Sequence, residues 1–212
     1  MLKDLTIKNF IEDLASSKPA PGGGSVSAFS AAIAASLCSM VFNLTINKKA
    51  FKELNEEIKK IVMNALENSN KLKDDFLDLM NKDAVEFEKF INIYKQKVNN
   101  DEERKAKEES LEEAYKKALG VPLEVARKAI KVYDYINIAC DYGNKNLISD
   151  GGVSAMTLQT ALESAVLNVR VNLPGIKDEN YKAIIILECD AIIAEGLIKK
   201  ENILKKVYNN IG

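Results

Sequence analysis

The residues with the clearest chemical potential form the run Pro21-Gly22-Gly23-Gly24-Ser25. Three successive glycines leave a bare backbone directly before a segment of helical apolar spacing. Free N–H groups and the helix dipole make such a helix N-terminus favourable for a carboxylate or a phosphate. The run therefore predicts either a ligand cradle or a tight turn with close helix packing, which glycine serves equally well. It matches neither a P-loop nor a dinucleotide fingerprint, because no Gly-Lys-Ser/Thr follows and no strand precedes it.

Asp83 is the best candidate for acid–base chemistry. It continues an apolar stripe through Phe76 and Met80 and precedes Phe87 and Phe90 at helical spacing, so its carboxylate is expected to face inward. Burial raises the pKa of a carboxyl group unless a cation or several donors compensate, which prepares a general acid or base. The alternatives are a structural pair with a buried lysine and a local break in the helix.

A loop of polar residues, Asn144, Asn146, Ser149 and Asp150, ends at the start of a later helix. The plain interpretation is a turn followed by an N-cap at Ser149 or Asp150. The functional interpretation is a cluster of hydrogen-bonding groups around a carboxylate. Spacing alone does not decide between the two.

A second loop, around Pro174-Gly175, carries Asn172, Lys177 and Asp178. Asp178 is expected to cap the last helix, because aspartate is a preferred N-cap residue. If the two loops converge, these side chains could also contribute to a site.

The complete absence of histidine limits the chemistry further. It removes Ser-His-Asp and Cys-His catalysis and most zinc sites, so an acid or base must be Asp, Glu, Lys, Tyr or Cys. The three cysteines, Cys38, Cys140 and Cys189, are widely separated within apolar helical patterns. We expect reduced core thiols and no metal site.

Helices must position these residues, since no useful length of sequence alternates with the two-residue period of a strand. We predict an all-α fold in which residues 1–212 form a single-domain bundle of about six to eight helices. The expected segments are Asp4 to Ala15, a helix from Gly24 or Ser25, one or two helices over Phe51 to Val98, a charged helix ending at Gly120, a new helix from Pro122 to near Asp141, one from Gly151 through Val169, and Glu179 to Tyr208.

Composition narrows the class of partner. Thirty basic and thirty-one acidic residues give a net charge of -1. The protein therefore has no overall positive electrostatic potential that would attract nucleic acid or an anionic membrane. The start lacks a signal-peptide pattern, and no later stretch is expected to span a bilayer. We therefore expect a cytoplasmic protein that engages neither nucleic acid nor membrane.

Four motifs in order resemble the cyclodeaminase/cyclohydrolase family, which includes the C-terminal half of formiminotransferase-cyclodeaminase and stand-alone methenyltetrahydrofolate cyclohydrolases. The resemblance covers nearly the whole chain. The motifs are Pro19-Ala20-Pro21-Gly22-Gly23-Gly24-Ser25-Val26, Val121-Pro122-Leu123-Glu124-Val125-Ala126, Gly143-Asn144-Lys145-Asn146 through Ser149-Asp150, and Val171-Asn172-Leu173 through Ile176-Lys177-Asp178.

The resemblance implies a homodimeric helical enzyme with a folate site near the glycine turn and no metal or nucleotide cofactor. Its substrate would be 5-formiminotetrahydrofolate, cyclised to 5,10-methenyltetrahydrofolate with loss of ammonia, or methenyltetrahydrofolate, hydrolysed to 10-formyltetrahydrofolate. The alternative is a non-catalytic helical dimer that binds folate or a protein partner.

Roles for the candidate residues follow as hypotheses from that chemistry. Asp83 or Asp150 would move the proton, with Lys177 and Asp178 as a proton-transfer or orienting pair. The substrate-binding set would be Pro21, Gly22, Gly23, Gly24, Ser25, Asn144, Asn146, Ser149 and Asn172.

Overall fold

A computed structural model describes all 212 residues as an elongated bundle of helices without strands. Its long helices are α2 (Gly23–Ile46), α4 (Glu56–Tyr94), α5 (Asp101–Tyr142), α6 (Ile148–Arg170) and α7 (Glu179–Ile211). The short elements are α1 (Ile7–Leu14), α3 (Lys49–Lys52) and the 3-10 turns η1 (Leu2–Asp4), η2 (Lys145–Leu147) and η3 (Leu173–Gly175). The predicted all-α class and helix number are confirmed.

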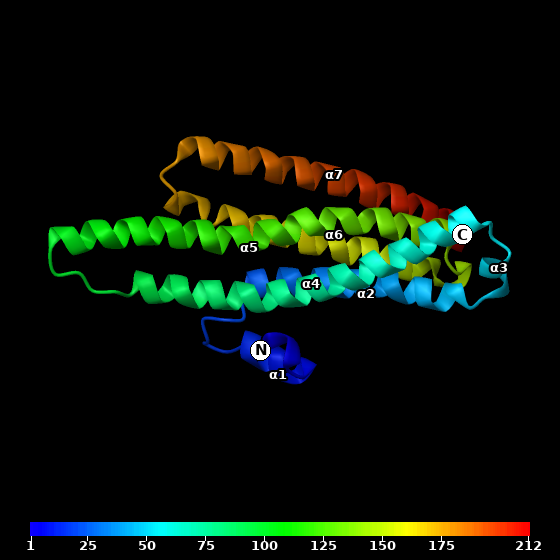
Figure 1. Cartoon of the computed structure of the whole chain (residues 1–212), viewed down its shortest axis with the longest axis horizontal. Coiled ribbons are helices and arrows are strands. Elements are labelled where there is room, and N and C mark those ends of the chain that lie inside the picture. Colours follow the sequence, from blue (N-terminus) through cyan, green and yellow to red (C-terminus); the bar gives the residue numbers. More distant parts are fainter.

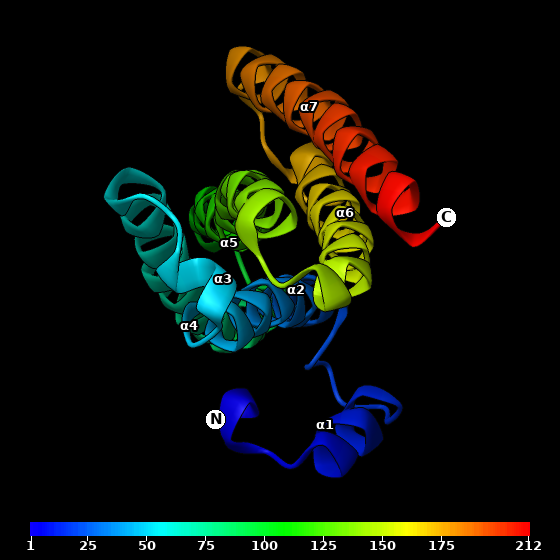
Figure 2. The ribbon, with the colours of Figure 1, turned by 90° about the vertical axis from the view of Figure 1, so that its right-hand side faces the viewer.

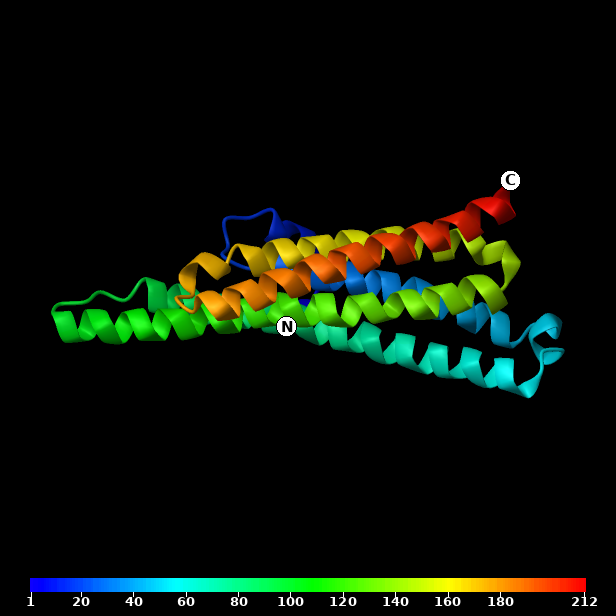
Figure 3. The same cartoon turned by 90° about the horizontal axis from the view of Figure 1, so that it is seen from above.

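The long helices lie nearly antiparallel to their neighbours in the chain (Figure 1). Helices α2, α4, α5 and α6 pack together, and α7 covers α5 and α6 (Figure 2). The tip of the α4–α5 hairpin projects beyond the other helices, as the view from above also shows (Figure 3). Helix α1 stands at the side of the bundle, and Phe10 is its only buried residue (Figure 2).

Helix α2 is the central packing element because its side chains are small. Ala28, Ala31, Ala34 and Ala35 have no exposed surface. The Ser154 hydroxyl of α6 donates a hydrogen bond to the Ala34 carbonyl oxygen at 2.7 Å, which requires the two helices to approach closely. Small residues thus let α2 contact both α4 and α6.

The same helix corrects one prediction from the sequence. Residues Gly23–Ile46 are long and apolar enough to cross a membrane by length and composition, with a mean hydropathy of 1.8 over their most apolar window. In the fold, 61% of that window is buried against other helices. The apolar character of α2 is therefore accounted for by its place in the core of the bundle.

Helix α5 corrects a second prediction. Gly120 and Pro122 were expected to separate two helices, but both lie inside one continuous helix. Proline lacks an N–H group and normally disturbs a helix interior. Here Pro122 is buried, and flanking core residues such as Leu119 and Val125 hold the helix together on both sides of it.

Three other boundaries differ from the prediction. Thr6 caps α1 and confines it to Ile7–Leu14, and the Asn55 side chain caps the single long helix α4. Helix α6 begins at Ile148, so Ser149 and Asp150 lie within its first turn and the prediction that one of them is the N-cap is wrong. The predicted cap at Asp178 is confirmed, because its carboxylate accepts the Tyr181 N–H at 3.0 Å.

The core also contains one buried polar connection. The Tyr133 hydroxyl of α5 donates to Oε1 of Gln159 in α6 at 2.6 Å, and Gln159 Nε2 donates to Glu163 at 2.7 Å. A Cβ on Gly196 of α7 would lie 2.9 Å from the same amide. The three free cysteines are buried as expected, and burial raises the pKa of Cys38 to about 12 and that of Cys140 to about 11.

The role of α2 is tested by enlarging one of its buried alanines. We expect Ala34→Leu to lower the free energy of unfolding by about 1–3 kcal/mol, because an overpacked core forces its neighbours apart. Denaturant unfolding followed by circular dichroism measures this. Ala106→Leu, at an exposed position of α5, is the matched control and should change stability little; equal effects at both positions would contradict the close packing of α2.

Candidate active site

A cavity of about 220 Å³ lies where the N-terminus of α2 meets α4, α5 and α6. It contains the glycine turn, one carboxylate and two asparagines. Its lining residues are Pro19, Ala20, Gly22, Gly23, Gly24, Asp83, Phe87, Ala118, Pro122, Asn168, Val171 and Asn172. We call this cavity the glycine-turn pocket.

Asp83 reaches the pocket from α4 and contacts the first turn of α2. Its Oδ2 accepts a hydrogen bond from the Ser25 hydroxyl at 2.9 Å. A Cβ on Gly24 would overlap the Asp83 carboxylate, so only glycine leaves room for this contact. The sequence-predicted residues Gly24, Ser25 and Asp83 are therefore brought together by the fold.

The protonation of Asp83 is governed by opposing effects. Burial raises the pKa of its carboxyl group above the ordinary value of 3.8, while hydrogen bonds from the Ser25 side chain and backbone lower it, and the net direction is upward. A carboxyl group with a raised pKa exchanges protons more readily near neutral pH than an exposed aspartate does. The predicted general acid or base is thus electrostatically suited to that role.

Two asparagines line the pocket, Asn168 of α6 and Asn172 just beyond the end of that helix. The Asn168 amide donates to the Ser164 carbonyl at 2.8 Å, and the Asn172 amide donates to the Asn168 carbonyl at 2.8 Å. With its N–H group engaged, Asn168 keeps Oδ1 beside Gly23, 3.1 Å from where a Cβ would stand. Asn172 was predicted as a site residue, whereas Asn168 was missed although it precedes Asn172 by one helical turn.

Pro122 removes a regular helical donor beside the pocket. In a regular helix the N–H group of residue 122 would bond the carbonyl of Ala118, but proline has no N–H group to donate. Ala118 and Pro122 both line the pocket. Because α5 continues through Pro122, the Ala118 carbonyl lacks its regular helical donor at a position that lines the pocket.

An aromatic row begins at the pocket and continues along α4. The ring of Phe87 lies 6.2 Å from that of Phe90, which lies 6.0 Å from Tyr94 and 4.7 Å from Tyr115 of α5. Phe87 lines the pocket and is 36% exposed. A flat ring at the entrance favours a planar aromatic ligand.

The other predicted loop lies at the opposite end of the bundle. The Asn144 N–H donates to the Thr45 hydroxyl at 2.8 Å, near the C-terminus of α2, and the Asn144 side chain caps Asn146. Ser149 is exposed and Asp150 half-buried in the first turn of α6. Within one chain these four residues and the glycine turn are at different ends of α2 and α6, so they do not converge in one chain (Figure 1).

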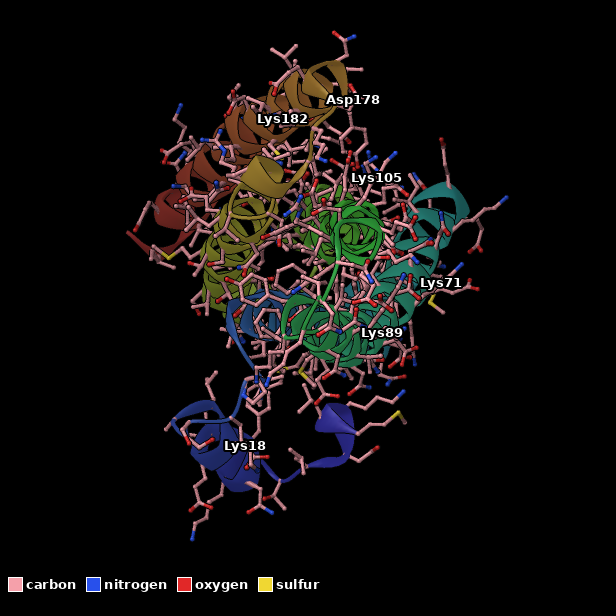
Figure 4. The ribbon with its side chains drawn as sticks, turned by 90° about the vertical axis from the view of Figure 1, so that its left-hand side faces the viewer. Lys18, Lys71, Lys89, Lys105, Asp178 and Lys182 are labelled. Atoms are coloured by element: carbon pink, nitrogen blue, oxygen red, sulfur yellow. The ribbon has the colours of Figure 1, made fainter.

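Lys177 and Asp178 do not line the pocket either. The Lys177 ammonium lies 3.4 Å from Glu108 of α5, and Asp178 serves as the N-cap of α7. Asp178 is seen at the start of α7, on the other side of α5 from Lys89 of α4 (Figure 4). Within one chain the two side chains therefore make separate structural contacts, and their role as a proton-transfer or orienting pair stays a prediction.

The sequence is similar to known proteins over nearly its whole length. A sequence model of the formiminotransferase-cyclodeaminase family matches residues 6–191. The chain belongs to this family. A methenyltetrahydrofolate cyclohydrolase of Methylorubrum extorquens is 36% identical over 206 residues, which cover 97% of each protein.

Relatives of this chain differ in length. The formimidoyltransferase-cyclodeaminase of Mus musculus is 30% identical over 181 residues, which cover 85% of this chain and 33% of that protein. A crystal structure of formiminotetrahydrofolate cyclodeaminase from Thermotoga maritima superposes with a TM-score of 0.87 at 27% identity and covers all of both chains. This family member therefore has the fold of the Thermotoga protein over its whole length.

The bare backbone at Gly24 is tested by two alanine substitutions. Gly120, inside α5, has open space where a Cβ would stand, so Gly120→Ala should raise the free energy of unfolding by about 0.5–1 kcal/mol. Gly24→Ala should lack this gain, because its methyl group displaces the Asp83 carboxylate from Ser25. Denaturant unfolding of both variants measures the difference, and an equal gain at both positions would contradict the close contact.

Proposed function

We propose that this chain is a tetrahydrofolate one-carbon enzyme that hydrolyses 5,10-methenyltetrahydrofolate to 10-formyltetrahydrofolate. The observation that carries the proposal is the Asp83 carboxylate, which is held against a bare glycine turn and has a raised pKa. The full-length similarity to a methenyltetrahydrofolate cyclohydrolase supports this substrate. The planar pterin suits the exposed ring of Phe87 at the pocket.

In the proposed reaction, water adds to the methenyl carbon that bridges N5 and N10. The ionised Asp83 carboxylate accepts a proton from this water as the carbon becomes tetrahedral. The bond from this carbon to N5 then breaks with its electron pair left on N5, and Asp83 returns the proton from water to N5. The remaining hydroxyl proton of the tetrahedral carbon is released to solvent, which leaves the formyl group on N10. Asn168 Oδ1 and the Ala118 carbonyl offer acceptors that hold N–H groups of the folate in place.

A second candidate is the cyclodeaminase reaction, in which N10 attacks the formimino carbon on N5 and ammonia leaves. The whole-chain superposition with the Thermotoga cyclodeaminase favours it. Both reactions pass through a tetrahedral carbon between N5 and N10, and both need a group that takes a proton from the attacking atom and returns one to the leaving nitrogen. Side-by-side turnover of methenyl- and 5-formiminotetrahydrofolate separates them, and we expect the higher kcat/KM with methenyltetrahydrofolate.

We further propose that the reaction uses no metal or nucleotide cofactor and that the enzyme is a cytoplasmic homodimer. The chain has no histidine and therefore no histidine ligands for a metal. Asp83 and the backbone groups of the pocket would supply the acid–base and hydrogen-bonding functions instead. Binding of both folates without turnover by the wild type would favour the non-catalytic alternative instead.

Replacement of the proposed base tests the mechanism directly. We expect Asp83→Asn to lower kcat/KM for methenyltetrahydrofolate by about 10²–10⁴-fold, the usual contribution of a positioned acid or base. Loss of the methenyl absorbance measures the rate, and circular dichroism checks folding. Asp74→Asn, on an exposed face of the same helix, should retain wild-type activity. A folded Asp83→Asn enzyme with near-normal turnover would exclude Asp83 as the base.

The pH profile tests the link between Asp83 and Ser25. A base is active when ionised, so the rate should fall on acidification through the pKa of Asp83, which lies above 3.8. The Ser25 hydrogen bond lowers this pKa, so Ser25→Ala should raise it and move the acid limb of kcat/KM to higher pH. Ser36→Ala, which removes a hydroxyl bonded within α2, should leave the limb in place. An unshifted limb in Ser25→Ala would show that another group controls the profile.

A further inference from the structure

Two of the residues that line the glycine-turn pocket come from parts of the chain that are remote in the sequence. Phe87 belongs to α4, and Asn172 lies just beyond the end of α6. The pterin of the proposed substrate is flat, so its fit depends on the spacing between the Phe87 ring and the Asn172 amide. That spacing is set by whatever fixes α4 relative to η3, the turn that follows Asn172.

The turn η3 fastens Asn172 to Gly175. The Gly175 N–H donates to the Asn172 carbonyl oxygen at 3.3 Å, and the Ile176 N–H donates to the Leu173 carbonyl oxygen at 3.0 Å. Leu173 and Ile176 are both buried in the core, which holds the turn in place. A displacement of Gly175 is therefore transmitted to Asn172.

Gly175 packs directly against the ring of Tyr115 in α5. A Cβ at position 175 would overlap three carbons of that ring, Cγ, Cδ2 and Cε2. The backbone of Gly175 does not adopt a positive φ, so space and not backbone conformation requires a glycine here. The contact uses the carbons of the Tyr115 ring and not its hydroxyl.

The same ring also contacts α4. Its centroid lies 4.7 Å from that of Phe90 with the two planes tilted by 59°, a favourable arrangement for an aromatic pair. Phe90 in turn lies 6.2 Å from Phe87. Tyr115 does not line the pocket, although Ala118, one turn later in α5, does. A chain of contacts through Tyr115 therefore connects Asn172 with Phe87 outside the pocket.

We propose that Tyr115 is a positioning residue of the glycine-turn pocket, whose ring sets the spacing between Phe87 and Asn172 and thereby the fit of the flat pterin. Tyr115 contacts no substrate and moves no proton. It acts on binding, because Asp83 is held separately by Ser25 and the first turn of α2. This proposal rests on the proposed folate chemistry.

Removal of the ring tests this role. We expect Tyr115→Ala to raise KM for methenyltetrahydrofolate by about ten-fold, the size of one good aromatic contact. The kcat should stay within about two-fold of the wild-type value, because the proton-transfer groups remain in place. Loss of the methenyl absorbance measures both constants. Calorimetry with tetrahydrofolate, which has no one-carbon bridge to react, should show the same rise in Kd.

Two matched variants separate positioning from packing. Tyr115→Phe keeps the ring carbons that contact Gly175, so its KM should equal that of the wild type. Tyr135→Ala removes another half-buried tyrosine of α5 that packs on the core but does not line the pocket. It should lower the thermal midpoint as Tyr115→Ala does, and it should leave KM and Kd unchanged.

A substitution on the other side of the contact tests the connection itself. Gly175→Ala should raise KM about as much as Tyr115→Ala does, because the new methyl group displaces the ring. In the Tyr115→Ala background the ring is absent, so Gly175→Ala should add no further rise. Such non-additivity is expected of two residues that act through one contact.

Three results would overturn the positioning role. These are wild-type KM and Kd in a folded Tyr115→Ala or Gly175→Ala enzyme, a further rise in KM in the double variant, or an equal rise in Tyr135→Ala. If Tyr115→Ala does not fold, KM and Kd of Gly175→Ala decide the matter. A wild-type enzyme that turns over neither folate would instead reject the proposed function, so the two failures are distinguishable.

Discussion

The contact between the first turn of α2 and Asp83 of α4 is the constraint on which the site depends. It requires a glycine at position 24 and a hydroxyl at position 25. It also requires that α4 be rotated about its axis so that Asp83 faces α2. Because α2 is also the central packing helix, the position of Asp83 is fixed by the same alanine-rich contacts that hold the core. A carboxylate at the N-terminus of α2 is stabilised by the helix dipole, which offsets part of its desolvation cost.

Periodicity predicts the helices well where one face is buried and the other solvated, as in α4, and it places Asp83 on the inward face. It fails at α5, because Gly120 and Pro122 are local signals for a helix end that the surrounding packing overrides. The start of α6 was displaced for a similar reason: Ser149 and Asp150 favour caps, yet the preceding turn η2 already leads into the helix.

The site residues likewise include some that the sequence predicted and some that it did not. The glycine run and Asp83 were predictable from short stretches of sequence. Consecutive glycines show directly that the backbone carries no side chains, and the spacing of apolar residues shows which face of its helix Asp83 occupies. Asn168 was missed because an asparagine within an apolar helix has no distinctive spacing by itself, and its role depends on Gly23 from another helix. The separation of Asp150 from Asp83 could not be predicted. Apolar spacing indicates which face of a helix a residue occupies, but not at which end of the bundle the residue lies.

The buried proline of α5 has a consequence for how the site tolerates sequence change. An acceptor made by a side chain disappears when that residue is replaced, but the carbonyl of Ala118 belongs to the main chain and persists whatever occupies position 118. Its availability is set four residues away, by a ring that has no N–H group. The missing helical donor of this pocket-lining residue is thus encoded at Pro122 and not at position 118, so variation at position 118 reshapes the pocket without removing this acceptor.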